Sequence, residues 1–387
     1  MRNIAYRYRI CPDAAQTVML KKTFGCCRFV YNLFLAYHKD VYASEKRNVS
    51  QYECMRMITQ LRRDKDCLWL STCDSMALQE SVKDLDRAYR SFFDGRGGYP
   101  RFHKRHASSQ SYRTRNQKGC IRIDGSHIVL PKLGPVKARI SRLPEGRILN
   151  ATVSRTASGK YFVSLCCEEE LVPKPNGGGS VGIDLGIKDL CVLSNGDVIP
   201  NPKHLSKYEK KLRREQRSLS RMIEANISHR DSLGRPVWKK PLSECSNIQK
   251  QRIQIARIHE KICNCRTDAL HKLSAKLVNE NQVIALESLN VKGMVKNHHL
   301  AKAIADASWS RFVTMLEYKG FEHGCDILKV STFFPSSQIC SSCGYQNPKV
   351  KDLAVRRWVC PQCGEVHDRD INAAVNVLSK ALAMQQP

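Results

Sequence analysis

The chain has 387 residues, and its 64 Lys plus Arg outnumber 36 Asp plus Glu, which gives a formal net charge of +28. A hydrophobic content of 42% is enough to build buried cores, so wholesale disorder is excluded, and the length suits two or three domains. The sequence has no apolar run of about 18 residues and no secretory signal near its N-terminus, so we expect a cytoplasmic protein with no membrane partner. The cationic surplus favours nucleic acid as the partner, because phosphate neutralisation by Lys and Arg supplies most non-specific affinity.

An N-terminal strand and a group of helices are predicted for the first part of the chain. Apolar and polar residues alternate over residues 1–12, which indicates a strand. Apolar residues then recur at helical spacing in two stretches: Leu20, Phe24, Cys27, Tyr31 and Phe34, and Leu78, Val82, Leu85, Tyr89 and Phe92. We expect most of these aromatic side chains to pack in a core, and residues 13–95 to form a helical module that ends in a glycine-rich loop.

Short strand patterns separated by Gly, Pro and Asn extend from residue 99 to about 170, and with the N-terminal strand they predict a β-barrel or sandwich. Residues 101–150 contain 12 Lys or Arg and only two acids, and aromatic residues alternate with these cations. Such interleaving suits phosphate contact combined with base stacking, whereas a solvated basic loop is the plain alternative. The candidate nucleic-acid contacts in this stretch are Arg101, Lys104, Arg105, Tyr112, Arg113 and Arg115.

A linker at residues 173–180 (PKPNGGGS) precedes a region of alternating strands and helices, an α/β layout that resembles the RNase H-like fold. Residues 201–280 form two long basic helices with 19 Lys or Arg against eight acids. This excess favours contact with a phosphate backbone over a merely solvated helical hairpin, with Arg213, Arg214 and Arg217 as candidates. The polar stretch 227–247 between the helices receives no assignment.

Three acidic residues lie within or at the ends of the apolar elements of this α/β region. Asp184 lies within the strand VGIDLG, Glu287 ends the strand VIALE, and Asp370 opens the last helix. Each alone could be an exposed strand end, an ion-paired residue or a helix cap, but three in one region favour a shared metal site. Two Mg²⁺ ions about 4 Å apart, held by carboxylate oxygens, activate water and neutralise charge in phosphodiester hydrolysis. The set therefore predicts metal-dependent strand cleavage.

Four of the 18 cysteines form two CxxC pairs, whereas the others are expected to be reduced thiols. Sixteen residues separate Cys340-x2-Cys343 from Cys360-x2-Cys363. Two such pairs supply four thiolates for tetrahedral Zn²⁺, and a redox role, which a single pair would favour, does not account for both. Because four protein ligands leave no open coordination position, we expect one structural Zn²⁺.

At these residues the chain resembles the TnpB family of transposon-associated proteins, which is related to type V CRISPR effectors. The matching stretches are VGIDLGIKDLCVLSNGDVI, IALESLNVKGMVKNHHLAKAIADASWSRF, FFPSSQICSSCG and WVCPQCGEVHDRDINAAVNVL, with LQESVKDLDRAYRSFF, GYPRFHKRH and QSYRT in the N-terminal half. The resemblance implies a RuvC-like nuclease domain over residues 181–387 with a zinc ribbon inserted at 336–366. It also implies a wedge-like β-barrel from residues 1–12 and 96–172, and a helical recognition module at 13–95.

The same resemblance implies an RNA-guided DNA endonuclease of a transposon. A guide RNA from the transposon end would pair with double-stranded target DNA beside a short transposon-adjacent motif. The family's catalytic carboxylates fall on Asp184, Glu287 and Asp370, which would hold two Mg²⁺ ions. Such a protein would act on the nucleoid of a prokaryotic cell.

Two other functions stay open, together with one choice of residue. A DNA-binding or RNA-guided regulator that does not cut would not need three acids, and a strand-joining transposase would not need the zinc ribbon. Asp368 and Asp370 both precede the last helix and compete as the third metal ligand. We expect Asp370 to be the ligand, because it adjoins Ile371, the first apolar anchor of that helix, and we expect Asp368 to cap the helix or to pair with an Arg.

Overall fold

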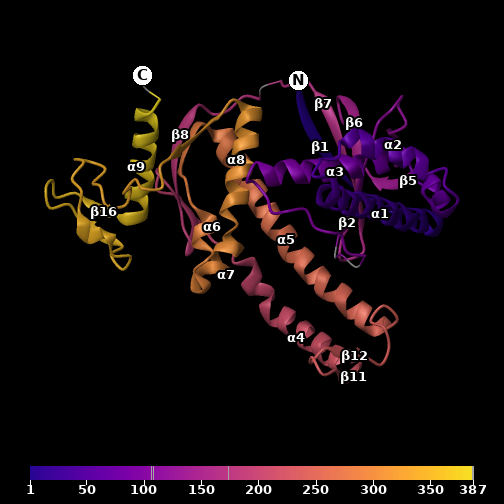
Figure 1. Cartoon of the computed structure of the whole chain (residues 1–387). Helices are drawn as coiled ribbons and strands as arrows, with labels where there is room; N and C mark the ends of the chain where they lie inside the picture. Colours follow the sequence, from indigo (N-terminus) through magenta and orange to yellow (C-terminus); the bar gives the residue numbers. More distant parts are fainter. Residues whose placement is uncertain (106, 108, 173, 386–387) are drawn as a thin grey trace. The chain divides into compact units, whose positions relative to one another are not determined.

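The computed structural model describes residues 1–105, 107, 109–172 and 174–385. The first position of the expected linker, residue 173, therefore lies outside the described residues, as do two positions of the expected barrel and the last two of the chain. The chain divides into two compact units, Met1–Leu171 and Val172–Pro387. Figure 1 shows the course of the chain through both.

A seven-stranded antiparallel sheet forms the β part of the first unit, in the order β2-β6-β7-β1-β5-β4-β3. Its strands are β1 (Arg2–Ile10), β2 (Gln110–Arg115), β3 (Arg122–Asp124), β4 (His127–Leu130), β5 (Gly134–Arg139), β6 (Arg147–Arg155) and β7 (Tyr161–Glu169). Strand β1 pairs with β7 along its whole length, and Tyr6, Tyr8 and Ile10 on its inner face are buried. The expected barrel is not closed by hydrogen bonding between the described strands, because β2 and β3 are opposite edges of the sheet.

The helices of the first unit pack on this sheet and confirm the two predicted helical stretches. They are α1 (Ala14–Glu45), α2 (Gln51–Leu61), the short 3₁₀ helix η1 (Lys65–Thr72) and α3 (Ser75–Phe93). Helix α1 begins with a capping box, in which Asp13 Oδ1 accepts from the Gln16 N–H at 2.8 Å and Gln16 Oε1 accepts from the Asp13 N–H at 3.1 Å. This cap fixes the start of the helix at Ala14, four residues after Ile10, the last residue of β1.

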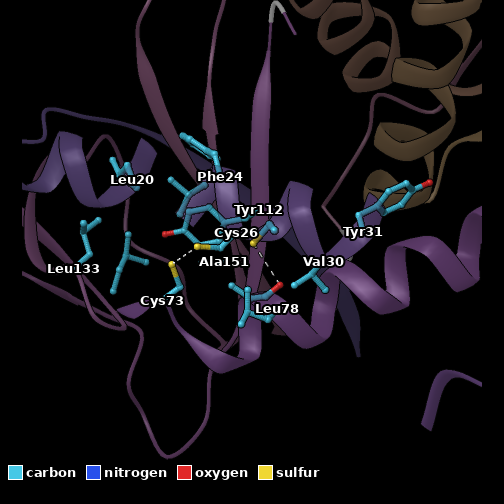
Figure 2. Close-up of a cluster of buried hydrophobic side chains, with 14 of the residues drawn as sticks. Leu20, Phe24, Cys26, Val30, Tyr31, Cys73, Leu78, Tyr112, Leu133 and Ala151 are labelled. Atoms are coloured by element: carbon cyan, nitrogen blue, oxygen red, sulfur yellow. Dashed lines mark hydrogen bonds between the residues drawn. The ribbon is translucent and has the colours of Figure 1, made fainter. Parts of the chain in front are cut away.

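The core of the first unit lies between α1, α3 and the sheet, as Figure 2 shows. Phe24 of α1 meets Tyr112 of β2 edge-on, with 5.6 Å between the ring centroids. The Cys26 and Cys73 sulfurs lie 2.9 Å apart among these rings, and both are free, buried thiols. They act as small apolar side chains, as expected for most cysteines outside the CxxC pairs.

The second unit is built on a five-stranded mixed sheet in the order β10-β9-β8-β13-β14. Its strands are β8 (Gly179–Leu185), β9 (Asp189–Leu193), β10 (Val198–Pro200), β13 (Asn281–Glu287) and β14 (Asp326–Val330). The first three form an antiparallel meander, whereas β13 is parallel to β8 and β14 is parallel to β13. Parallel pairing requires helical crossovers, which α4 to α8 supply.

Helices cover both faces of this sheet. Helices α5 (Ser246–Glu280), α7 (His298–Ala307) and α8 (Trp309–His323) pack with Ile183, Ile284 and Leu286, whereas α9 (Arg369–Ala383) packs with Ala285. Side chains alternate between faces along a strand, so Asp184 and Glu287 belong to the face that α9 covers. Gly182 lets α9 approach closely, because an added Cβ there would overlap the carbonyl oxygen of Ala374.

A helical hairpin forms the crossover from β10 to β13. Helix α4 (His204–Ala225) packs on α5 through an apolar seam of Leu212, Ile258 and Ile262. The unassigned stretch 227–247 contains a small β-hairpin, β11 (Ile227–Arg230) with β12 (Pro236–Trp238), at the far end of the helices in Figure 1. The hairpin was not predicted from the sequence.

Smaller elements complete the second unit. They are α6 (Val291–Met294), the 3₁₀ helix η2 (Pro348–Lys351), and the two-stranded sheet of β15 (Arg357–Val359) and β16 (Val366–Asp368). In the described part of the chain, no helix is long and apolar enough to cross a membrane.

Candidate active site and metal centre

Asp184 and Glu287 lie at the C-terminal ends of neighbouring parallel strands. Strands β8 and β13 are paired with Ile183 beside Leu286, and the next residue along each strand is one of the two acids. Asp370 lies in the first turn of α9, on the same face of the sheet. In open α/β sheets, the edge formed by the carboxyl ends of parallel strands is where ligands bind. The fold therefore brings the three predicted carboxylates to one edge of one sheet.

Glu287 and Asp370 both act electrostatically on the buried Asp184. Burial raises the pKa of Asp184 to about 7, and the negative charges of Glu287 and Asp370 act in the same direction. The positive charges of Arg369 and Arg356 oppose this shift without cancelling it. A divalent cation would favour the ionised form of all three acids, and their oxygen atoms are the ligands that Mg²⁺ prefers. The residues present therefore have the ligand chemistry of a magnesium site, but among the described residues the oxygen atoms of the three acids do not all lie within 4.8 Å of one another.

Glu287 and Asp370 are held by different neighbours. Ser336 Oγ donates a hydrogen bond to Glu287 Oε1, and Arg356 Nη1 lies 3.5 Å from Asp370 Oδ2. Asp368 Oδ1 accepts from the backbone N–H groups of Asp370 at 3.1 Å and of Ile371 at 3.3 Å. The expected role of Asp368 as the cap of α9 is confirmed. The cap is formed by the Asp368 carboxylate, and the Asp370 carboxylate takes no part in it.

The four cysteines of the predicted zinc site converge. Of the described residues, they form the one group of His, Cys, Asp or Glu side chains whose ligand atoms all lie within 4.8 Å of one another. The sulfurs of Cys340 and Cys363 are 3.6 Å apart, as are those of Cys343 and Cys360. A tetrahedron with Zn–S bonds of about 2.3 Å has edges of about 3.8 Å, so the two sulfur–sulfur distances of 3.6 Å are close to those that Zn²⁺ requires.

Each cysteine pair is a tight knuckle of the chain. The residue after each pair is a glycine with positive φ, Gly344 at 79° and Gly364 at 77°. The N–H of each glycine donates to the carbonyl of the first cysteine of its pair, at 2.9 Å in both cases. The two knuckles are therefore built alike, and a side chain at either glycine would strain the turn.

Buried asparagines join the zinc ribbon to α9. The side-chain amide of Asn376 donates to the carbonyl oxygens of Ser336 at 2.8 Å and of Ile339 at 2.6 Å. Asn372 donates to the same Ile339 oxygen at 2.7 Å and accepts from the Ser341 N–H at 3.0 Å. Because Ser336 also contacts Glu287, the segment before the first knuckle connects the ribbon, the helix of Asp370 and the strand of Glu287.

The candidate nucleic-acid contacts of the first unit separate into three groups. Arg101, Lys104 and Arg105 are exposed and form no ion pair within the described residues. Arg113 is half-buried on β2, and Arg115 pairs with the buried Glu80 at 2.7 Å. Tyr112 is 7% exposed and packs in the core, so the expectation that a base stacks on it is wrong. Its alternation with the flanking cations places it on the inner face of β2.

The candidate contacts on α4 are all exposed but differ in their partners. Arg213 pairs with Glu209 on the same helix, and Arg214 pairs with Glu215 at 3.0 Å. Arg217 forms no ion pair in the part of the chain that the structure describes. Of the three, Arg217 has the charge most available to a phosphate.

Sequence reasoning missed the residues that support the carboxylates. Ser336 and Asn376 were not singled out, nor was Arg369, which is 7% exposed and donates to the Asp352 carbonyl at 2.9 Å. Their signal was present only as parts of the quoted stretches FFPSSQ and DINAAVN. No spacing rule connects a serine to a glutamate 49 positions away.

Comparison with known proteins gives the family. Residues 164–298 match a family model described as “Probable transposase”, residues 309–377 match “Cas12f1-like, TNB domain”, and residues 1–47 match “Helix-turn-helix domain”. A Streptomyces pristinaespiralis protein named “Putative RNA-guided DNA endonuclease” is 38% identical over 382 residues, covering 98% of this chain and 89% of that protein. The chain belongs to the TnpB family.

A second relative supports this placement, and a solved structure shares the fold. A protein from Escherichia coli (strain K12) with the same description is 30% identical to this TnpB chain, covering 98% of it and 92% of the relative. The structure of a Cas12f1–sgRNA–target DNA complex superposes with a TM-score of 0.55 at 14% identity, covering 94% of this chain and 83% of that one. At that identity the likeness concerns the fold alone.

One family description differs from the geometry. Residues 1–47, which match the helix-turn-helix model, fold here as the strand β1 followed by the single 32-residue helix α1. A DNA-reading pair of short helices is therefore not what this segment offers.

Proposed function

We propose that this TnpB-family chain is an RNA-guided DNA endonuclease of a transposon, with Asp184, Glu287 and Asp370 as its catalytic carboxylates. The observation that carries the proposal is the convergence of these acids at the carboxyl ends of β8 and β13 and the start of α9. The names of the two relatives support the guide and the DNA substrate. The strand order, an antiparallel meander followed by two parallel strands, supports an RNase H-like, RuvC-type nuclease.

The proposed domains follow from that reading. Residues 181–387 are the nuclease domain, with the zinc ribbon at 336–366. Residues 1–12 and 96–172 are the wedge-like part, and residues 13–95 are the recognition module. The guide RNA would come from the transposon end, and the target would be double-stranded DNA beside a short motif that the protein reads while base pairing reads the sequence. The protein would act on the nucleoid of a prokaryotic cell.

The three carboxylates would hold two Mg²⁺ ions. When bound, the ions supply an activated water and neutralise charge on the scissile phosphate and the leaving oxygen. The chain's contribution is to hold the ligands rigidly. Strands β8 and β13 fix Asp184 and Glu287, Ser336 orients the Glu287 carboxylate through Oε1, and the Asp368 cap fixes the first turn of α9 under Asp370.

The four cysteines would hold one structural Zn²⁺. Four sulfur ligands leave no position for water or substrate, so the zinc would act by stabilising the ribbon. The hydrogen bonds from Asn372 and Asn376 support a second consequence, because a folded ribbon orders the segment that carries Ser336. Zinc would then contribute indirectly to the position of Glu287.

The proposal is tested with the protein purified together with its RNA. The RNA is sequenced, and a linear DNA that carries the matching target beside randomised flanking sequence is added with Mg²⁺. We expect cleavage of matched DNA next to a common flanking motif, and none with a mismatched guide or with Asp184→Ala. Guided binding of the matched DNA by the unsubstituted protein without any cleavage would instead indicate the non-cutting regulator.

A further inference from the structure

An exposed aromatic cluster on the first unit has no part in the proposed cleavage. Phe93 is 73% exposed, Tyr99 is 44% exposed and Phe102 is 50% exposed. Phe93 ends α3, and the other two belong to residues 99–105, which form neither helix nor strand and are called the strap below. Large apolar rings gathered on a surface mark a binding site more often than chance exposure does.

The strap is fixed in place by its contacts with α1 and α3. The Tyr99 ring meets the rings of Tyr89 and Phe92 edge-on, with centroids 5.7 and 5.3 Å apart, and its hydroxyl lies 3.2 Å from that of Tyr89. At the other end, Asn32 donates to the His103 carbonyl at 3.0 Å and accepts from the His103 N–H at 2.8 Å. A ring that is already positioned loses little conformational freedom when a ligand stacks on it.

A hollow of about 530 Å³ opens beside Tyr99. Its aromatic lining includes Tyr42, Tyr89, Phe93 and Tyr99, and two arginines, Arg47 and Arg90, lie at its polar side. Both arginines are already paired, Arg47 with Glu53 at 3.1 Å and Arg90 with Asp86 at 2.8 Å. The hollow therefore offers flat apolar faces with little net charge, which suits a neutral aromatic ring such as a nucleobase.

The strap supplies the positive charge that the hollow lacks. Residues 99–105 contain three Lys or Arg and no Asp or Glu. Arg101 and Lys104 are exposed and have no ion pair within the described residues. Lys39 of α1 adds a cation between two rings, with its Nζ 5.5 Å from the Tyr99 centroid and 4.7 Å from that of Phe102. Neutral rings beside a run of cations match the separate needs of bases and phosphates.

We infer that the hollow and the strap bind single-stranded nucleic acid, with an unpaired base stacked on Phe93 and Tyr99 and its flanking phosphates on Arg101 and Lys104. The inference rests on the proposed function for its class of partner. It is tested by binding in Mg²⁺-free buffer, so that its failure is separate from a failure to cleave. The competing occupant of an exposed aromatic surface is a second copy of the chain.

The test measures the fluorescence anisotropy of labelled oligonucleotides as the full chain, freed of its RNA, is added. One oligonucleotide is oligouridine of about eight nucleotides, and the other is an abasic strand of equal length. Phe93→Leu and Tyr99→Leu should each weaken oligouridine binding roughly tenfold and leave abasic binding unchanged. The matched control is Tyr52→Leu, since Tyr52 is 74% exposed on α2 and is not part of the hollow. Equal losses for both strands, or no loss for either, would overturn the inference.

Two further measurements test the inference in ways that do not depend on the binding affinities of the variants alone. Oligouridine containing 5-iodouracil, irradiated with the unsubstituted protein, should crosslink to the peptides of Phe93 or Tyr99, and crosslinks confined to other peptides would contradict the inference. Sedimentation of the unsubstituted chain and of Phe93→Leu addresses the second copy. Self-association that Phe93→Leu abolishes without changing oligouridine binding would assign the surface to a dimer and overturn the inference.

Discussion

Replacing Gly182 by alanine tests whether the packing of α9 on the sheet fixes the carboxylate site. Gly182 lies two residues before Asp184 on β8, on the face that α9 covers. An added Cβ would overlap the carbonyl oxygen of Ala374 and lie 2.9 Å from Leu378 Cβ and 3.0 Å from the Ala374 carbonyl carbon. The obstacle is mainly helix backbone, which cannot turn aside as a flexible side chain could. Helix α9 must therefore retreat as a body.

The expected losses of stability and of cleavage rate in Gly182→Ala follow from this contact. Overpacking of this kind costs about 1–3 kcal/mol, which in a unit of this length lowers the melting temperature by about 2–4 °C per kcal/mol. Asp370 is one helical turn before Ala374, so the retreat carries it away from Asp184. A displacement of about 1 Å in a catalytic group can lower the rate about 100-fold. We expect a modest loss of stability and a large loss of cleavage.

The assay pairs thermal unfolding of the zinc-loaded protein with the rate of guided cleavage at saturating Mg²⁺. Gly25→Ala is the matched control, because Gly25 lies within α1 and an added Cβ meets only the end of the Arg28 side chain, at 4.0 Å. It should leave both quantities unchanged or slightly raise the melting temperature. A Gly182→Ala protein that melts and cleaves like the unsubstituted one would refute the argument that this contact positions Asp370.

Three other predictions concern the site and the ribbon. The pKa of Asp184 rises from 3.8 to about 7 on folding, so the folded chain holds a proton that the unfolded chain releases. Without Mg²⁺, the free energy of unfolding should therefore fall as pH rises from about 4 to about 7. Denaturant titrations at several pH values should show a smaller fall for Asp184→Asn. The same dependence on pH in both proteins would contradict the assignment of this effect to Asp184. Ser336→Ala should raise the Mg²⁺ concentration needed for half-maximal cleavage several-fold without lowering zinc content, and Ser336→Thr should restore it. The exposed Ser342 is the control, and Ser342→Ala should behave like the unsubstituted protein. Cys343→Ser should lower zinc content, destabilise the C-terminal region and reduce cleavage indirectly, and a metal assay that finds no zinc in active protein would remove the ribbon site.

The parts of the site that the sequence predicted are those with local signals. Burying an unpaired carboxylate in an apolar strand costs free energy, so such a residue is a candidate for a functional role. This argument identified Asp184 and Glu287. Two CxxC pairs at ribbon spacing are typical of a structural zinc site, and this pattern identified the four cysteines. The residues that hold these ligands, Ser336 and Asn376, have no local signal, because their partners are brought to them only by the fold.

Burial of the aromatic residues was the least predictable feature. Tyr112 lies in a stretch rich in arginines and was therefore predicted to contact nucleic acid, yet its ring is buried on the inner face of β2. The predicted helical stripe ends at Phe92, and the next residue, Phe93, is 73% exposed where α3 ends. Which elements cover a ring depends on tertiary contacts, and sequence periodicity does not specify those contacts. The same reason explains why the strands were predicted but the pairing of the sheet edges was not.

The central claim is that Asp370, and not Asp368, joins Asp184 and Glu287 as a metal ligand for cleavage. The most direct measurement compares Asp370→Ala with Asp368→Ala for guided binding of matched DNA and for its Mg²⁺-dependent cleavage. Removing a ligand carboxylate takes away metal and leaves the base pairing and phosphate contacts that hold the target. We predict that Asp370→Ala binds the target but does not cut it, whereas Asp368→Ala loses only a helix cap and keeps substantial cleavage. An inactive Asp368→Ala beside an active Asp370→Ala would contradict the account.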